Sequence, residues 1–219
     1  MKTDKPLNPP NSSAQQIVCH WTGGSYIPSA LDRHHYHFLV DGEGMVRRGE
    51  FTIDANARCV PGEYAAHVRG WNPHTIGLAV CCMHEAQEKP FDPGKYPIRR
   101  SQWDTLVELA ATLCLHYGIP ITERTVLMHS EVEPTIGIPQ RGKWDINVVP
   151  MNDKGRVMVL PPHEAGDAFR ANVQAAYAKL TAPPATESRG VTAADIIALR
   201  DELTAQFFNA FEPLLNKLK

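Results

Sequence analysis

A chain of 219 residues, 43% of them hydrophobic, can bury one sizeable core and has room for a short additional segment. The formal net charge of −2 at pH 7 provides no general attraction for nucleic acid or for an anionic membrane surface. The apolar runs are shorter than the roughly 20 residues that cross a bilayer, and the first ten residues lack the apolar stretch of a secretory signal. We therefore expect a cytoplasmic, enzyme-sized domain without a transmembrane segment or a nucleic-acid partner.

The first part of the chain alternates polar segments with short apolar runs. Residues 1–15 are polar and rich in proline, which predicts a flexible arm. Residues 17–19 form a β-type run that places His20 at the end of a strand. Residues 36–40 and 45–47 flank the sequence Asp-Gly-Glu-Gly, which predicts a β-hairpin whose first strand begins at Tyr36.

The middle of the chain contains a long connection, a buried strand and a helix. Residues 49–74 are rich in Gly, Asn, Pro and Arg, which is typical of a surface connection that shapes a site. Residues 75–83 are continuously apolar, as expected for a central strand buried on both faces. From residue 101 an amphipathic helix is predicted, because apolar residues recur at intervals of three and four: Leu106, Leu109, Leu113 and Tyr117.

The second half completes the expected α/β domain. Residues 125–128 form a short strand that leads to His129, and a loop rich in Gly and Pro continues to Asp145. The alternation of strands and helices predicts a mixed central β-sheet flanked by helices, which we place within residues 16–160.

The C-terminal segments are expected to be an appendage to this domain. Residues 161–180 are expected to form a helix that packs on the domain or follows it. Residues 181–190 have the composition of a linker. Residues 191–219 predict an amphipathic helix. An apolar face of this kind packs against the parent domain or a second copy of the chain, so a homo-oligomer is one expectation.

Three potential metal ligands follow the predicted strands and the last loop: His20, His129 and Asp145. Two imidazoles and a carboxylate suit a catalytic Zn²⁺, because three protein ligands leave a fourth position for water. Ligands that come from separate strand ends cannot be recognised by spacing alone. Histidines that are hydrogen-bonded at the rim of a core would give the same pattern, so the residues by themselves leave both interpretations open.

A resemblance to a known family favours the metal site. It is carried, in order, by residues 17–24 (IVCHWTGG), 36–44 (YHFLVDGEG), 66–80 (AHVRGWNPHTIGLAV), 117–120 (YGIP) and 126–145 (VLMHSEVEPTIGIPQRGKWD). This ordered set resembles the zinc-dependent N-acetylmuramoyl-L-alanine amidases of type 2, which include phage endolysins, bacterial muropeptide amidases and peptidoglycan recognition proteins. The resemblance implies the fold of this family. It also implies that zinc-activated water cleaves the amide bond between N-acetylmuramic acid and L-alanine in peptidoglycan.

The resemblance also implies roles for five residues. His20, His129 and Asp145 correspond to the zinc ligands, and Asp145 replaces the cysteine that many members have. Lys143 corresponds to a residue that faces the scissile carbonyl and would stabilise an oxyanion, although on its own it is a solvated loop lysine. Tyr36 corresponds to the tyrosine of endolysin-like members. A phenol with a pKa of about 10 is a poor base, so we expect Tyr36 to orient the water.

Further residues are candidates for substrate contacts. His67 corresponds to a family histidine beside the cleft and would contact the peptide stem, or else it is a loop imidazole. Trp21 and Trp144 neighbour two ligands and could stack on sugar faces or pack structurally. Because Tyr36 and His37 alternate along a predicted strand, only one of them can face the metal, and we expect Tyr36.

The alternatives differ in substrate and in class. Muropeptide-recycling members have a catalytic glutamate where this chain has Ala79, which favours the tyrosine-using, endolysin-like branch. Such an enzyme would reach the cell wall only after release from the cytoplasm. The second hypothesis is a cytoplasmic amidase that recycles soluble muropeptides. Hypotheses of another class are a peptidoglycan-binding module without catalysis, which the three candidate ligands disfavour, and a structural component of a phage particle.

Overall fold

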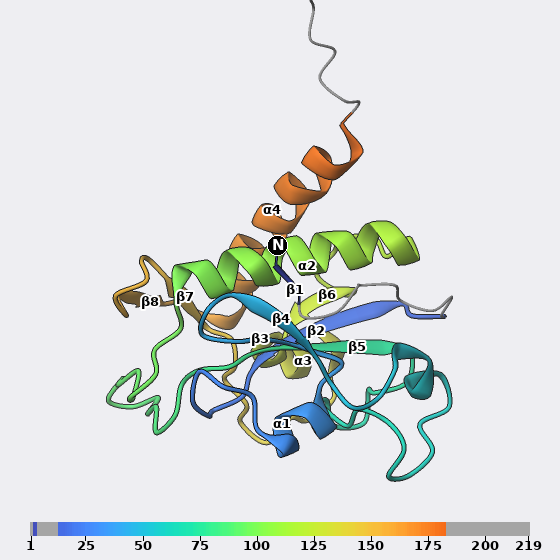
Figure 1. Cartoon of the computed structure of the whole chain (residues 1–219), viewed down its shortest axis with the longest axis horizontal. Helices are drawn as coiled ribbons and strands as arrows, with labels where there is room; N and C mark the ends of the chain where they lie inside the picture. Colours follow the sequence, from blue (N-terminus) through green and yellow to red (C-terminus); the bar gives the residue numbers. More distant parts are fainter. Residues whose placement is uncertain (1, 4–12, 183–219) are drawn as a thin grey trace, which may run out of the picture. The chain divides into compact units, whose positions relative to one another are not determined.

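The computed structural model describes residues 2–3 and 13–182 (Figure 1). The predicted helix at residues 191–219, and most of the predicted arm and linker, lie outside the described residues. The described helices include none that combines the length and the apolar character needed to cross a bilayer. Because most of the predicted arm and linker lie outside the described residues, the division of the chain into an arm, a catalytic domain and a linker stays a prediction.

A mixed sheet forms the centre of the described region, with the strand order β1-β4-β3-β5-β2-β6. Its strands are β1 (Lys2–Thr3), β2 (Gln16–Trp21), β3 (Phe38–Val40), β4 (Met45–Arg48), β5 (Thr75–Val80) and β6 (Val126–Met128). β3 and β4 form the predicted antiparallel hairpin. β5 lies between β3 and β2, runs parallel to both, and is buried along its whole length, as predicted for the central strand.

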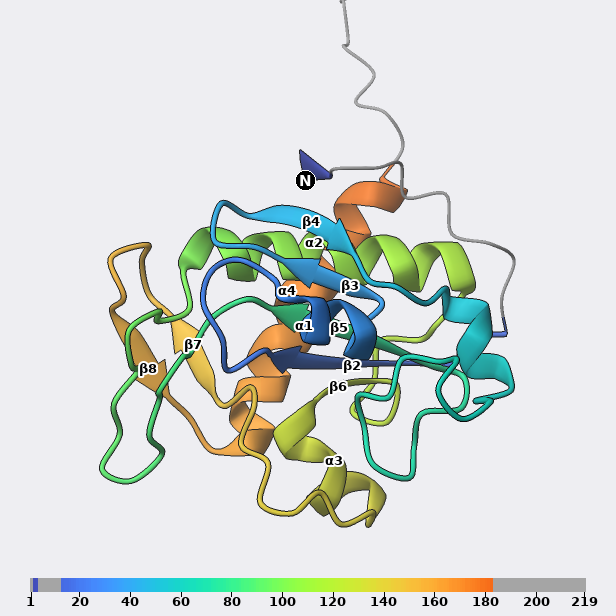
Figure 2. The ribbon, with the colours of Figure 1, turned by 60° about the horizontal axis from the view of Figure 1, so that its bottom comes forward.

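The remaining elements cover this sheet or extend from it. They are α1 (Ala30–His35), the 3₁₀ helix η1 (Ile53–Ala57), α2 (Arg100–Tyr117), α3 (His129–Ile136), the hairpin of β7 (Val148–Pro150) and β8 (Val157–Val159), and α4 (Pro162–Thr181). Figures 1 and 2 show α2 and α4 on one side of the sheet and α1 on the other. α2 ends where Gly118 adopts a left-handed conformation with φ of 65°. The mixed α/β fold class is confirmed.

The alternation of side chains along the strands separates the two faces of the sheet. Ile17, Cys19 and Trp21 of β2 point into the main core beneath α2 and α4. Val18 lies in a smaller cluster on the opposite face, and His20, two residues further along, shares that face. The large apolar core thus occupies one face of the sheet, and the other face carries smaller apolar clusters together with buried polar side chains such as His20.

Two short helices were not predicted. α1 begins with a capping box in which Ser29 and Asp32 hydrogen-bond to each other's backbone, and it ends just before Tyr36. Tyr36 is therefore the residue that caps α1, and β3 starts only at Phe38, two residues later than expected. α3 contains Pro134. Its sequence resembles a loop, but Val132 packs against the strand residues of the smaller cluster and compensates for the unfavourable proline.

A buried ion pair joins α4 to the start of α3. Arg170 donates to both carboxylate oxygens of Glu131, at 3.0 and 2.9 Å, and to the carbonyl of Val126 at 3.1 Å. Glu131 also accepts the backbone N–H of Met128, the residue before His129. Burial raises the pKa of Glu131 in spite of Arg170, so the carboxylate depends on its partner to stay ionised.

Arg170→Met should leave the Glu131 carboxylate buried without a counter-charge. We expect the free energy of unfolding to fall by about 3–5 kcal/mol in urea denaturation of the metal-free protein. The double variant Glu131→Gln/Arg170→Met should lose less, because glutamine still accepts the N–H of Met128 and carries no charge. Lys179→Met changes an exposed residue of the same helix and serves as the control. A single variant as stable as this control would contradict the interpretation.

Candidate metal centre

The pairing of β2 with β6 brings two histidines together. These parallel strands pair Cys19 with Met128, so the residues that follow in the chain, His20 and His129, lie at the same edge of the sheet. His20 is the fifth residue of β2, and His129 is the first residue of α3. Their Nδ1 atoms are 3.0 Å apart. The predicted convergence of the strand-end histidines therefore follows from the register of one parallel pair.

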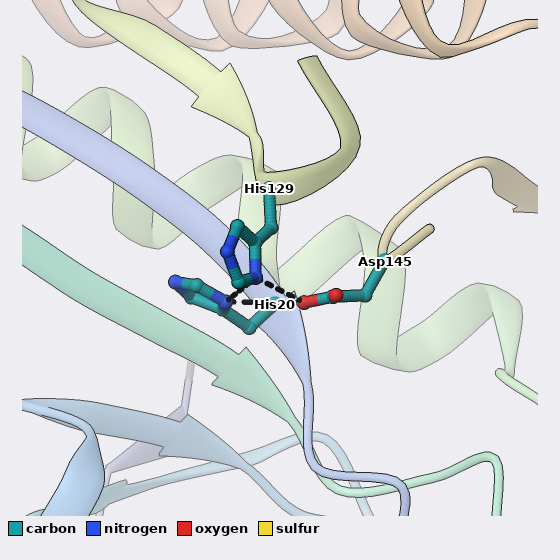
Figure 3. Close-up of side chains that lie close together, drawn as sticks. All are labelled: His20, His129 and Asp145. Atoms are coloured by element: carbon teal, nitrogen blue, oxygen red, sulfur yellow. Dashed lines mark hydrogen bonds and ion pairs between the residues drawn. The ribbon is translucent and has the colours of Figure 1, made fainter. Parts of the chain in front are cut away.

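Asp145 reaches the same point from the loop that precedes β7. Its backbone carbonyl accepts the N–H of Ser130 at 2.6 Å, which fixes this loop against the first turn of α3. Asp145 Oδ2 lies 3.1 Å from Nδ1 of His20 and 3.1 Å from Nδ1 of His129. Figure 3 shows the three side chains directed toward one another. All three residues are buried: the exposed fraction is 0% for His20, 4% for His129 and 5% for Asp145.

The geometry fits a single Zn²⁺. Bond lengths of about 2.0–2.1 Å in a tetrahedral site place neighbouring ligand atoms roughly 3.3 Å apart. The three facing atoms of His20, His129 and Asp145 are separated by 3.0–3.1 Å, so a small rearrangement would admit the ion. Two imidazole nitrogens and one carboxylate oxygen are also the donor set of a catalytic zinc site. These residues could therefore hold a metal ion with one position open.

The protonation states suit metal binding at neutral pH. Burial and the neighbouring His129 lower the pKa of His20 to about 4, so its imidazole is neutral. Burial acts to lower the pKa of His129 as well, but the Asp145 carboxylate outweighs it and the net shift is upward. Burial opposes ionisation of Asp145, yet the positive charge that His129 carries when it is protonated holds the pKa of Asp145 below the ordinary value. Asp145 is therefore ionised whenever the protein is near neutrality.

His67 and Gln140 surround the histidine pair. Nδ1 of His67 lies 3.1 Å from Nε2 of His20, and Oε1 of Gln140 lies 3.0 Å from Nε2 of His129. Both nitrogens of His67 have partners inside the protein, since Nε2 contacts the carbonyl of Thr75. A hydrogen bond from His67 to a peptide stem would have to replace one of these. Gln140 was not a candidate from the sequence, because nothing in a Gly- and Pro-rich segment distinguishes it.

A pocket of about 580 Å³ is lined by His129 and Asp145, and His20 lies buried directly beside these two residues. Tyr36 lines it, with its ring centroid 5.1 Å from that of His20. His37 instead bonds to Asn56 and to the N–H of Gly77, away from the ligand atoms. Burial, followed by the Asp145 carboxylate, raises the pKa of Tyr36, so the phenol stays protonated and can donate a hydrogen bond.

Cations and tryptophans complete the surroundings of the pocket. Lys143 lines it together with Arg69 and Arg141, and among the described residues none of these three side chains has an ion-pair partner. Trp21 also lines the pocket, whereas Trp144 packs edge-to-face on Trp21 with ring centroids 4.6 Å apart. Trp144 thus contacts Trp21 and does not itself line the pocket.

The affinity for Zn²⁺ should fall as the pH is lowered. A metal must displace the proton from Nδ1 of His129, whose pKa lies above the ordinary value of about 6.5. Above that pKa we expect constant affinity, and below it a loss of about tenfold per pH unit. His20, with its pKa of about 4, should add a second proton only in acid. Competition with a chelator between about pH 5 and pH 8 measures this, and an affinity independent of pH would contradict it.

Comparison with known proteins gives the family. The family model of the N-acetylmuramoyl-L-alanine amidases matches residues 10–146, which is more than half of the chain. A search of curated proteins gave no match.

Solved structures with a similar chain include the amidase LysC from Clostridium intestinale URNW, at 17% identity and a TM-score of 0.42, with 73% of this chain and 87% of that chain covered. The Ph2119 endolysin from Thermus scotoductus MAT2119 bacteriophage Ph2119 is 21% identical with a TM-score of 0.34, over 64% and 82% of the two chains. The amidase AmiD from E. coli is 17% identical with a TM-score of 0.39, over 58% and 52%. The assignment of the chain to a family rests on the match to the family model. By that match, the chain belongs to the N-acetylmuramoyl-L-alanine amidase family.

Proposed function

We propose that this protein is a zinc-dependent peptidoglycan amidase that hydrolyses the bond between N-acetylmuramic acid and L-alanine of the stem peptide. The observation that carries the proposal is the convergence of His20, His129 and Asp145, the last two of which line an open pocket, in a chain of this family. A binding module without catalysis would not need three buried ligand atoms that face one point.

The residues around the pocket have complementary roles in this reaction. Zn²⁺ held by three protein ligands supplies Lewis-acid chemistry that activates water and polarises a carbonyl. The ammonium group of Lys143, exposed at the pocket, is available to stabilise negative charge on the oxygen of the scissile carbonyl. The protonated phenol of Tyr36 donates a hydrogen bond that orients the attacking water. The structure of the pocket thus supports acyl transfer to water.

The charge of the pocket suits an anionic peptide. Arg69, Arg141 and Lys143 line it, and Asp145 is the only carboxylate among its described lining residues. Because Asp145 would be neutralised by the metal, the open pocket presents net positive charge. Guanidinium groups bind carboxylates with two parallel hydrogen bonds. Free carboxylates of the stem peptide are the expected partners of this surface.

An endolysin-like role is our preferred form of this proposal. The residue that pairs with His20 on β5 is Ala79, so no carboxylate stands at that position beside the ligands. Tyr36 lies beside His20 and packs against the cluster that contains Ala79. This arrangement supports the tyrosine-using branch over the branch that relies on a glutamate. Intact peptidoglycan is then the expected substrate.

The zinc-loaded protein should release new alanine amino termini from purified sacculi. Removal of the metal with a chelator should abolish the release, and added Zn²⁺ should restore it. Soluble anhydro-muropeptide serves as the comparison substrate, and a strong preference for it would favour the recycling amidase. Binding of sacculi without any new amino termini would favour a binding module and contradict the proposal.

Lys143→Ala should lower turnover about 10²-fold while the zinc content stays at one ion per chain, since one oxyanion stabiliser is lost. Tyr36→Phe should lower turnover with the same zinc content, because the orienting hydrogen bond is removed but the ring still packs. Lys154→Ala, an exposed lysine outside the pocket, is the control. Turnover equal to that of this control would remove the substituted residue from the mechanism.

A further inference from the structure

Hydrogen bonds outside the metal site determine which nitrogen of His67 carries its proton. Nε2 of His67 lies 3.3 Å from the carbonyl oxygen of Thr75. A carbonyl oxygen only accepts hydrogen bonds, so Nε2 must be the protonated nitrogen. A neutral imidazole has one N–H group and one lone pair. The lone pair of His67 is therefore on Nδ1, the atom that faces His20.

The same reasoning extends to His20. Nδ1 of His67 lies 3.1 Å from Nε2 of His20. Because the first atom carries a lone pair, the second must donate. The proton of neutral His20 is then on Nε2, and its Nδ1 presents a lone pair to Asp145 and His129. A chain from the carbonyl of Thr75 through His67 thus selects the tautomer of His20.

Gln140 selects the tautomer of His129 in a similar way. The amide nitrogen of Gln140 donates to the backbone carbonyls of Arg69 and Ile138, both at 3.0 Å. These two acceptors fix the orientation of the amide, so its oxygen Oε1 faces Nε2 of His129 at 3.0 Å and also accepts the N–H of Arg69 at 3.2 Å. Nε2 of His129 must donate to this oxygen. Its Nδ1 is then left with a lone pair.

We propose that His67 and Gln140 are positioning residues that hold both histidine ligands in the Nε2-protonated form, so that both Nδ1 lone pairs face the metal. This inference rests on the zinc site of the proposed function. When both histidines are neutral and both tautomers are fixed, three acceptor atoms lie 3.0–3.1 Å apart with no hydrogen between them. Their mutual repulsion is relieved by a cation, which makes the site a preorganised metal receptor.

The packing keeps both positioning residues in place. His67 lies directly over Gly77 of β5, where an added Cβ atom would be 2.5 Å from the imidazole ring. Glycine at this position therefore makes room for the ring. The backbone N–H of Gln140 donates to Glu133 of α3 at 2.8 Å, and its side chain is buried. This packing holds both side chains beside the histidines that they contact.

The tautomers can be observed in the wild-type protein without metal. Proton–nitrogen correlation spectra of the imidazoles, recorded at about pH 8.5 to keep the histidines neutral, distinguish the two nitrogens of each ring. We expect His20 and His129 to be protonated on Nε2. Protonation on Nδ1 of either ring would overturn the inference for the residue that contacts it. This measurement needs neither activity nor a variant.

Variants then test the contribution to metal affinity. Gln140→Met removes the acceptor at similar size, and His67→Phe removes both nitrogens while keeping a ring. Each should weaken Zn²⁺ binding about 10–100-fold in competition with a chelator, the usual effect of losing such a partner. In Gln140→Met the spectrum of His129 should change and that of His20 should not. His67→Asn keeps an acceptor near the position of Nδ1 and should recover part of the affinity.

The control is His74→Gln, because His74 bonds to Ser13 and touches neither ligand. Melting temperatures of the metal-free proteins identify variants that bind poorly because they fold poorly. If the wild type fails to bind Zn²⁺, the proposed function fails. If the wild type binds it and the folded His67 and Gln140 variants bind it equally well, the positioning role fails while the metal site stands.

Discussion

Cys19 pairs with Met128 in the parallel ladder between β2 and β6, and this register decides whether the two imidazoles meet. A slip of one residue in either strand would turn its histidine toward the core face beneath α2. The apolar residues that alternate with His20 along β2 favour this register, since they pack into the main core beneath α2 and α4. The hydrophobic core and the metal site thus depend on the same pairing.

The two faces of the sheet divide the tasks of the molecule. The face toward α2 and α4 buries large apolar side chains such as Trp103 and Phe169, which supply most of the stabilisation. The other face carries buried polar groups, which are costly unless each one has a partner. His20, His37 and His67 meet this condition through hydrogen bonds to one another, to amides and to backbone carbonyls.

The sequence predicted the features that depend on local pattern. The apolar run of β5, the turn between β3 and β4, and the helical period of α2 are each encoded within a few consecutive residues. The three candidate ligands were identified through resemblance, because their spacing of 109 and 16 residues contains no local signal. α1 and α3 were missed, since a short helix or one with an internal proline depends on tertiary contacts.

Gln140 could not be predicted for a related reason. Its role comes from the orientation of one amide group, and that orientation is set by two carbonyls supplied by Arg69 and Ile138. Arg69 is 71 residues away in the chain, so only the folded structure brings this acceptor into place. Residues that could bind the metal have a recognisable chemical type, whereas the role of Gln140 is defined by geometry alone.

The buried ion pair of Arg170 and Glu131 has a consequence for dynamics. Glu131 accepts the N–H of Met128, so detachment of α4 would loosen the backbone immediately before His129. A ligand that binds only the intact form stabilises every element on which that form depends. Local opening of α4 and metal occupancy are therefore thermodynamically linked. Amide exchange along α4 would slow when the ion is present, although the helix itself contributes no ligand.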